Sequence, residues 1–223
     1  MTIFIIKIIA CVTMVLDHIK YAIPETEGIL TNYFGRLAFP LYAFLLTEGY
    51  VHTKDLKKYY YRMIIFAIIS QIPFMLFRTL VGEWKMLNIM FTLLLGLIAI
   101  TVYDKEKRKY ISIPIIILLI WMGKILKVDY GWYGVTTVIL LYLLKNNKSF
   151  IPFSYLLLLI VYYYSRIKSF NFGTEIILYI LFSWSSTFIM MIYNGKEGKK
   201  LKYFYYIFYP LHMIIIYLIS LVI

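Results

Sequence analysis

Residues 3–23 read IFIIKIIACVTMVLDHIKYAI, and this stretch decides the fold class. It is long and apolar enough to form one membrane-spanning helix, which needs about 20 mostly apolar residues. Near its end, however, it carries an aspartate and a histidine, Asp17 and His18. An ionisable side chain at the bilayer centre costs on the order of 3 kcal/mol by insertion scales. The stretch therefore predicts a membrane protein with a polar site inside the membrane.

The rest of the chain has the same character. Of 223 residues, 62% are hydrophobic and only 15% are charged, and the mean hydropathy is +0.80. A soluble domain of this size could not bury that much apolar surface in one core, whereas lipid accepts it. We therefore predict an all-α fold, a polytopic transmembrane helical bundle forming a single domain over residues 1–223. The predicted spans, about nine, are 3–23, 33–51, 60–81, 86–103, 110–126, 131–144, 150–165, 174–193 and 201–222.

Basic residues are concentrated in one set of connectors between the predicted spans, and the formal net charge is +12. We interpret this as the positive-inside signal of membrane proteins and predict no nucleic-acid partner. The richer set is Lys54, Lys57, Lys58, Arg62, Lys105, Lys107, Arg108, Lys109, Lys145, Lys148, Lys196, Lys199, Lys200 and Lys202. The poorer set is Lys20, Arg78, Lys85, Lys124, Lys127, Arg166 and Lys168. The ratio of roughly two to one predicts a multi-pass protein of the cell membrane with a cytosolic N-terminus.

The polar residues of the first predicted span are candidates for function. His18 lies about 15 residues into the helix, in the outer half of the membrane. It is either a buried histidine bonded to a neighbouring helix or a functional group. Adjacent helical residues project about 100° apart, so Asp17 is expected to pair with another helix and not with His18. Arg36, near the outer end of the second span, is the expected partner, in a helix-registering salt bridge or in a site.

Other polar groups occur farther along the chain. Asn88 opens the fourth span, on the same face as Thr92 and Gly96, where small residues favour helix packing. Asp129, before the sixth span, is expected either to cap that helix or to line a site. A basic cluster at the cytosolic end of the second span has two readings, an ordinary positive-inside loop or an anion site for a phosphate-bearing cofactor. Its members are Glu48, His52, Lys54, Lys57, Lys58 and Arg62.

Several local strings, in order along nearly the whole chain, resemble the TraX family, which includes a member linked to N-terminal acetylation of conjugative pilin. The strings run from Lys7-Ile-Ile-Ala and Met14-Val-Leu-Asp17-His18 through Gly35-Arg36-Leu-Ala-Phe-Pro40, Glu48-Gly-Tyr-Val-His52, Tyr61-Arg62, Ser70-Gln71-Ile-Pro73-Phe, Leu87-Asn88-Ile-Met-Phe-Thr92, Asp129-Tyr130-Gly131-Trp-Tyr-Gly134 and Tyr193-Asn194-Gly195 to Phe208-Tyr209-Pro210-Leu-His212. The last string is also similar to the Tyr-x-x-His of acyltransferase family 3 proteins. A histidine on the first helix is a further, looser likeness to those proteins and to heparan acetyltransferases.

The resemblance implies a transmembrane acyltransferase that uses acetyl-CoA, or another acyl-CoA, as its donor. On this hypothesis His18 is a general base or an acyl carrier, kept neutral by desolvation, and Asp17 belongs to the same catalytic group. Arg36 or Asn88 stabilises the developing oxyanion. The expected cofactor contacts are His52, Lys57, Lys58, Arg62, Tyr209 and His212, and the expected substrate contacts are Glu48, Asp129 and Tyr130.

The sequence does not decide whether the acceptor is a peptide, a glycan or a lipid. In each case an amine or a hydroxyl would be the nucleophile. A proton-coupled transporter or channel would use the same intramembrane polar residues, although such proteins more often show internal repeats, which we do not find. A membrane scaffold would explain the apolar mass but not the polar residues. The three histidines and the one cysteine are spread over the first, second and last predicted helices, which leaves a metal site possible but unsupported, so none is predicted.

Overall fold

A helix forms in every predicted span. The computed structural model describes residues 1–83, 85–167, 173–200 and 202–222, and no named strand occurs among them. The helices are α1 (Ile3–Ile19), α2 (Ile29–Asn32), α3 (Ala38–His52), α4 (Leu56–Ile69), α5 (Gln71–Thr79), α6 (Ile89–Lys105), α7 (Lys109–Ile125), α8 (Gly131–Leu143), α9 (Ile151–Ile167), α10 (Thr174–Met191) and α11 (Lys202–Ser220). Three 3₁₀ turns join them: η1 (Pro24–Thr26), η2 (Phe34–Leu37) and η3 (Lys148–Phe150). The all-α prediction is confirmed.

Five of these segments are both long and apolar enough to cross a membrane, counted over the described residues. They are Ile29–His52, Leu56–Thr79, Lys148–Ile167, Thr174–Met191 and Tyr203–Ser220. Helices α1, α6 and α7 have 17 residues each, which at 1.5 Å per residue gives about 25 Å, the lower limit for a span. Helix α8 is shorter, with 13 residues. The chain is therefore a multi-pass helical membrane protein.

Two prolines explain where the spans depart from single regular helices. Proline has no N–H and its ring clashes with the carbonyl four residues earlier. Pro73 would face the carbonyl of Ile69, and the predicted span 60–81 accordingly breaks after Ile69 into α4 and α5. Pro40 would face the carbonyl of Arg36, and the chain before α3 takes the tighter 3₁₀ form in η2. Arg36 thereby lies on an irregular segment at the end of a span.

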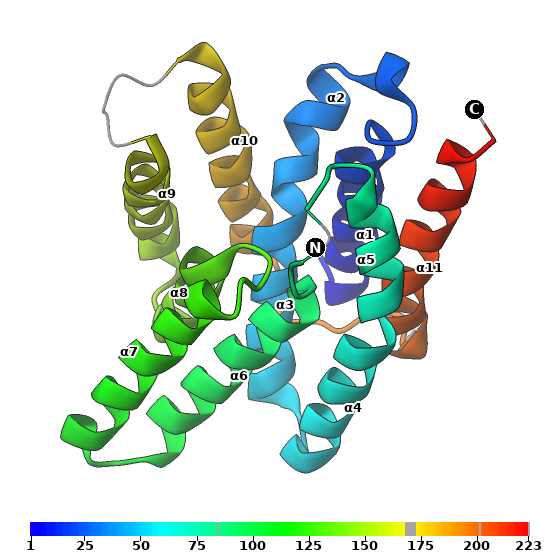
Figure 1. The fold of residues 1–223 in the computed structure, drawn as a ribbon. Coiled ribbons are helices and arrows are strands. Elements are labelled where there is room, and N and C mark those ends of the chain that lie inside the picture. The colour runs from blue at the N-terminus through cyan, green and yellow to red at the C-terminus, as the bar shows by residue number, and fades with distance from the viewer. Residues whose placement is uncertain (84, 168–172, 201, 223) are drawn as a thin grey trace.

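The connectors lie at two opposite ends of the bundle. In Figure 1 the α3–α4 and α6–α7 connectors are at the lower end, while the α1–α2 link and the C-terminus are at the upper end. The Met1 ammonium donates to the Ile192 carbonyl at 2.8 Å, which joins the N-terminus to the α10–α11 connector. Lys148 Nζ, in the α8–α9 connector, lies 3.8 Å from Glu48 Oε1 near the end of α3. The richer basic set thus gathers at the end that holds the N-terminus, as the cytosolic assignment requires. Lys168 and the side chain of Lys202 lie outside the described part of the chain.

The predicted small-residue seam packs α6 against α8. A Cβ on Gly96 would lie 2.8 Å from Val138, and one on Gly134 would lie 2.4 Å from Thr92 Cγ2. Either contact is too short for real carbon atoms, so both glycines are needed for this close approach. Helix α3 lies between α1, α6, α8 and α10 and contacts all four. It forms the centre of the bundle.

Candidate functional site

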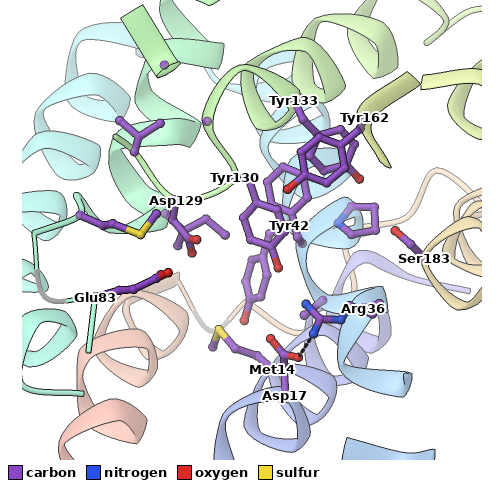
Figure 2. A pocket seen from close by; sticks show the side chains of 18 of the residues that line it. Met14, Asp17, Arg36, Tyr42, Glu83, Asp129, Tyr130, Tyr133, Tyr162 and Ser183 are labelled. Atoms are coloured by element: carbon purple, nitrogen blue, oxygen red, sulfur yellow. Dashed lines mark ion pairs between the residues drawn. The ribbon is translucent and has the colours of Figure 1, made fainter. Parts of the chain in front are cut away.

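A cavity of about 720 Å³ opens at the end of the bundle opposite the N-terminus. Its walls come from α1, η2, α3, α5, the α7–α8 link, α8 and α9, with further side chains from α10 and α11. Inside the bundle it reaches Tyr42 of α3 and Tyr209 of α11. The Tyr209 hydroxyl is buried and donates no hydrogen bond within the described chain. Figure 2 shows Asp17 with Arg36 on one side of this cavity and Asp129 with Glu83 on the other, Tyr130 lying between them in that view.

The ion pair predicted between Asp17 and Arg36 is present. Arg36 Nη2 lies 3.7 Å from Asp17 Oδ1, and Lys20 Nζ lies 3.9 Å from the same oxygen. The Arg36 guanidinium also covers the ring of Tyr179 at 4.7 Å. Gly35 makes the approach possible, because a Cβ there would lie 2.5 Å from Asp17 Cβ. The 3₁₀ turn therefore holds Arg36 against α1 at the cavity wall.

His18 and His212 meet at the same wall, although 194 residues separate them in sequence. His18 Nδ1 lies 2.8 Å from His212 Nε2, and the two rings are nearly parallel, at 11° with centroids 5.1 Å apart. Phe77 of α5 packs on His18 at 4.8 Å. His18 lines the cavity, whereas His212, only 5% exposed, stands behind it.

The hydrogen-bond geometry assigns the protons of two neutral rings. His212 Nδ1 lies 3.0 Å from the Phe208 carbonyl oxygen, which can only accept, so this nitrogen carries the proton. His212 Nε2 is then an acceptor, and His18 Nδ1 must donate to it. The remaining lone pair belongs to His18 Nε2, which accepts no hydrogen bond from any described residue. A neutral imidazole with a free lone pair at a cavity wall can act as a base or a nucleophile.

Asp129 and Tyr130 line the cavity where the α7–α8 link meets the start of α6. The Asp129 N–H donates to the Leu87 carbonyl at 2.8 Å, and the Asp129 carbonyl accepts from the Thr92 hydroxyl. Burial, reinforced by the charge of Asp17, raises the pKa of Asp129 to about 6, against the opposing effect of nearby arginines. Asp129 does not cap α8: Tyr130 is the residue before the helix, and no side-chain hydrogen bond caps it. The Asp129 carboxyl instead faces the cavity.

Asn88 lies outside the cavity, in the junction between α4, α5 and α6. Its amide nitrogen donates to the Ala67 carbonyl at 2.7 Å and to Gln71 Oε1 at 2.9 Å. Its Oδ1 accepts from the Met90 N–H at 2.9 Å and so caps α6. Both N–H donors of the amide are already used, and the side chain is fully buried. This arrangement favours a positioning role for Asn88.

The remaining predicted residues lie at the opposite, basic end. Glu48 pairs with His52 at 3.7 Å and with Lys148 at 3.8 Å, so it holds the end of α3 to the α8–α9 connector. The side chains of Lys57 and Lys58 are exposed in the first turn of α4, and Lys58 pairs there with Asp55, the residue that caps the helix. Arg62 lies 5.7 Å above the Tyr59 ring, and its Nε is buried without a hydrogen bond to any described residue.

Several cavity residues were not predicted as members of the site. Arg78, at the end of α5, forms an ion pair with Glu83. Arg166 of α9 donates to the Tyr162 hydroxyl at 2.9 Å. The Ser183 hydroxyl of α10 is hydrogen-bonded to the Tyr155 hydroxyl at 2.9 Å. The Tyr155 hydroxyl is hydrogen-bonded in turn to the Tyr133 hydroxyl of α8 at 2.6 Å. One feature of the sequence could have identified Arg78 as a candidate site residue. It directly follows the apolar run 72–77, which places its charge within reach of the membrane interior.

Comparison with known proteins matches this chain to one family. The family model described as "TraX protein" matches residues 3–220. A curated relative from Dichelobacter nodosus, named "Probable fimbrial assembly protein FimC, serogroup H1", is 27% identical, and the match covers 94% of this chain and 92% of the relative. No solved structure matches the chain significantly. With the family model covering nearly every residue of the bundle, the chain belongs to the TraX family.

Proposed function

We propose that this TraX protein is an acyltransferase of the bacterial cell membrane, with His18 as its reaction centre. It moves an acetyl or other short acyl group from an acyl-CoA on the cytosolic side to an amine or hydroxyl in the outer cavity. One observation carries the proposal: the neutral His18–His212 pair leaves one free lone pair at the wall of a cavity of about 720 Å³. The family's link to pilin acetylation and the name of the fimbrial relative support the same reading.

His18 Nε2 acts as the general base in this reaction. The acceptor's amine nitrogen or hydroxyl oxygen attacks the thioester carbonyl carbon, a C–N or C–O bond forms, and the C–S bond breaks. His18 Nε2 takes the acceptor's proton and returns it to the departing thiolate. His212 is a positioning residue, because its bond to Nδ1 fixes the ring and stabilises the imidazolium. The same lone pair would also serve an acyl-carrier route, which double-displacement kinetics would reveal.

Two cavity groups suit the charge that develops on the thioester oxygen. Arg36 has a buried Nε that forms no hydrogen bond within the described residues, and the Asp17 carboxylate fixes its guanidinium. The buried hydroxyl of Tyr209 is a second free donor, one turn before His212 on α11. Donors that are already oriented stabilise an oxyanion without the cost of rearranging water. In this proposal Arg36 and Tyr209 therefore share that role.

The basic end of the bundle suits the head group of the acyl donor. Exposed Lys57 and Lys58, with the free Nε of Arg62, fit a group rich in phosphate. Helix α4 meets α11 there, because the rings of Phe66 and Tyr206 stack 4.8 Å apart. Tyr209 and His212 follow on α11, so one helix connects the proposed head-group site to the reaction centre.

The test is acyl transfer and donor binding by purified protein. Saturable thermal stabilisation by acetyl-CoA is expected, weaker after Arg62→Ala and unchanged after Arg108→Ala, which removes an exposed arginine from another basic connector. His18→Ala should abolish transfer of labelled acetyl groups to a mixture of small amines and alcohols. Full transfer by folded His18→Ala protein would refute the proposal. No stabilisation by acetyl-CoA, together with solute flux in sealed liposomes, would point to a transporter.

A further inference from the structure

The basic residues of the outer end surround the cavity. Four of the poorer basic set line it: Arg78, Lys124, Lys127 and Arg166. Lys85 lies with Lys127 in a smaller adjoining pocket of about 480 Å³. Positive residues are disfavoured on the translocated side of a membrane protein, so their collection around one opening calls for an explanation.

These charges exceed the acids that could balance them. The cavity wall carries five basic side chains, with Arg36 added to those four, against three acidic ones, Asp17, Glu83 and Asp129. Asp17 is engaged by Arg36 and Lys20. Lys124 and Lys127 are exposed and form no ion pair with any described residue. The mouth of the cavity is therefore electropositive, and it favours an anionic ligand.

Arg78 is the best-placed group to bind that anion. Its side chain is 16% exposed, and its Nε is buried without a hydrogen-bond partner in the described chain. Its guanidinium now contacts Glu83, a carboxylate whose own side chain is 62% exposed on the α5–α6 link. An exposed carboxylate on a buried guanidinium occupies the position that a ligand oxyanion would take.

Arg78 also lies next to the reaction centre and to the rim lysines. The preceding residue, Phe77, packs on the His18 ring at 4.8 Å. On the other side, the Leu87 N–H donates to the Lys127 carbonyl at 3.1 Å, which brings the α7–α8 link against the link that follows Arg78. An oxyanion on Arg78 would therefore have Lys127 near it at the mouth and His18 near it inside the cavity.

We infer that the acceptor carries an oxyanion, a phosphate, sulfate or carboxylate, which binds Arg78 in place of Glu83 with Lys124 and Lys127 beside it. The acceptor's amine or hydroxyl then points inward to His18. The inference rests on the proposed acyltransferase for the fate of the acceptor, but the oxyanion site itself makes no use of that chemistry.

Sulfate is the first probe, because its charge does not change near neutral pH. Thermal unfolding of the detergent-purified protein is followed against sulfate at constant ionic strength, with chloride as the replacement. Saturable stabilisation at millimolar sulfate is expected. The apparent affinity should fall about tenfold in Arg78→Gln, as for loss of a charge-assisted hydrogen bond. The double variant Lys124→Gln with Lys127→Gln changes only exposed side chains, so it should weaken sulfate binding without disturbing the fold. The control variant Lys107→Gln, at the basic end, should bind sulfate like the parent.

Acyl transfer is then compared between 2-aminoethyl phosphate, β-alanine and propylamine. A preference for the anionic amines that disappears in Arg78→Gln supports the inference. Acyl transfer to phosphatidylethanolamine in the micelles then tells whether the acceptor's phosphate belongs to a lipid headgroup or to a soluble molecule. Equal transfer to all three amines, with no response to sulfate, overturns the inference and leaves the acyltransferase standing. Sulfate binding lost in Arg78→Gln, with no transfer to any amine, keeps the oxyanion site and overturns the acyltransferase. Neither binding nor transfer overturns both.

Discussion

Replacing Gly35 by alanine tests whether the close approach of η2 to α1 sets the geometry of the site. A Cβ at Gly35 would lie 2.5 Å from Asp17 Cβ and 2.7 Å from Asp17 Cα. Carbon atoms normally meet at about 3.5–4.0 Å, so η2 must move away from α1 by roughly 1 Å. Overpacking of this kind costs about 1–3 kcal/mol. A misplacement of about 1 Å near reacting groups can lower a rate roughly 100-fold.

The matched control is Gly28→Ala, in the same link between α1 and α3. A Cβ there would have its nearest neighbour 4.0 Å away, and the backbone is extended, so any residue fits. Thermal unfolding and acyl transfer per folded molecule are measured for both variants. We expect Gly35→Ala to lose a few degrees of stability and most of its transfer, and Gly28→Ala to behave like the parent. If Gly35→Ala transferred acyl groups at the parental rate, the Asp17–Arg36 geometry would not matter for the reaction.

Three further substitutions test other parts of the site. Asp129, with its pKa raised to about 6 by burial, loses its charge as the pH falls, so sulfate affinity should rise between pH 7.5 and 5. The Asp129→Asn variant should bind sulfate tightly at both pH values. If its sulfate affinity still rose with falling pH as it does in the parent, the pH dependence would not come from Asp129. Asn88→Ala loses a helix cap and one of the two hydrogen bonds to Gln71, and it leaves the buried Ala67 carbonyl without this donor, which should cost about 2–3 kcal/mol of unfolding free energy. Its transfer per folded molecule should stay within a few-fold of the parent, and a collapse of transfer with intact folding would restore Asn88 as an oxyanion donor. Tyr155→Phe removes the hydroxyl that joins Tyr133 to Ser183 and should lower the thermal stability by about 1–2 kcal/mol, measured by a melt in the same detergent.

The sequence was a good guide to the spans because apolar length alone defines them. The nine predicted stretches all contain helices, and α7, for example, runs over Lys109–Ile125 where 110–126 was predicted. The shape within a span was harder to predict. Pro73 breaks its segment at Ser70, whereas Pro114 and Pro210 lie inside continuous helices. A proline removes the same hydrogen bond in each case, and only packing decides whether the helix bends or stops.

The site was partly predictable for a similar reason. Asp17 and Arg36 could be paired from the sequence because two opposite charges at one depth in a membrane must find each other or remain costly. The contact between His18 and His212 could not, because periodicity shows which face of a helix a residue occupies but not which helix lies against that face. Arg78 and Arg166 were counted as ordinary charges in outer connectors. Their membership of the cavity depends on how α5 and α9 tilt toward it, which no local pattern encodes.

The polar contacts of this site also have a structural task. Lipid tails are as apolar as leucine side chains, so apolar contact alone does not decide which transmembrane helices meet. In this bundle His18 and His212 join the first helix to the last, the Asp17–Arg36 pair joins α1 to η2, and the Tyr155 hydroxyl joins α8, α9 and α10. All three contacts border the same cavity. A substitution at any of them is therefore expected to loosen the bundle as well as alter the chemistry. For this reason His18→Ala is expected to melt at a lower temperature than the parent as well as to lose transfer. Its transfer must therefore be measured per folded molecule, because loss of transfer by protein that is still folded is what assigns a chemical task to His18.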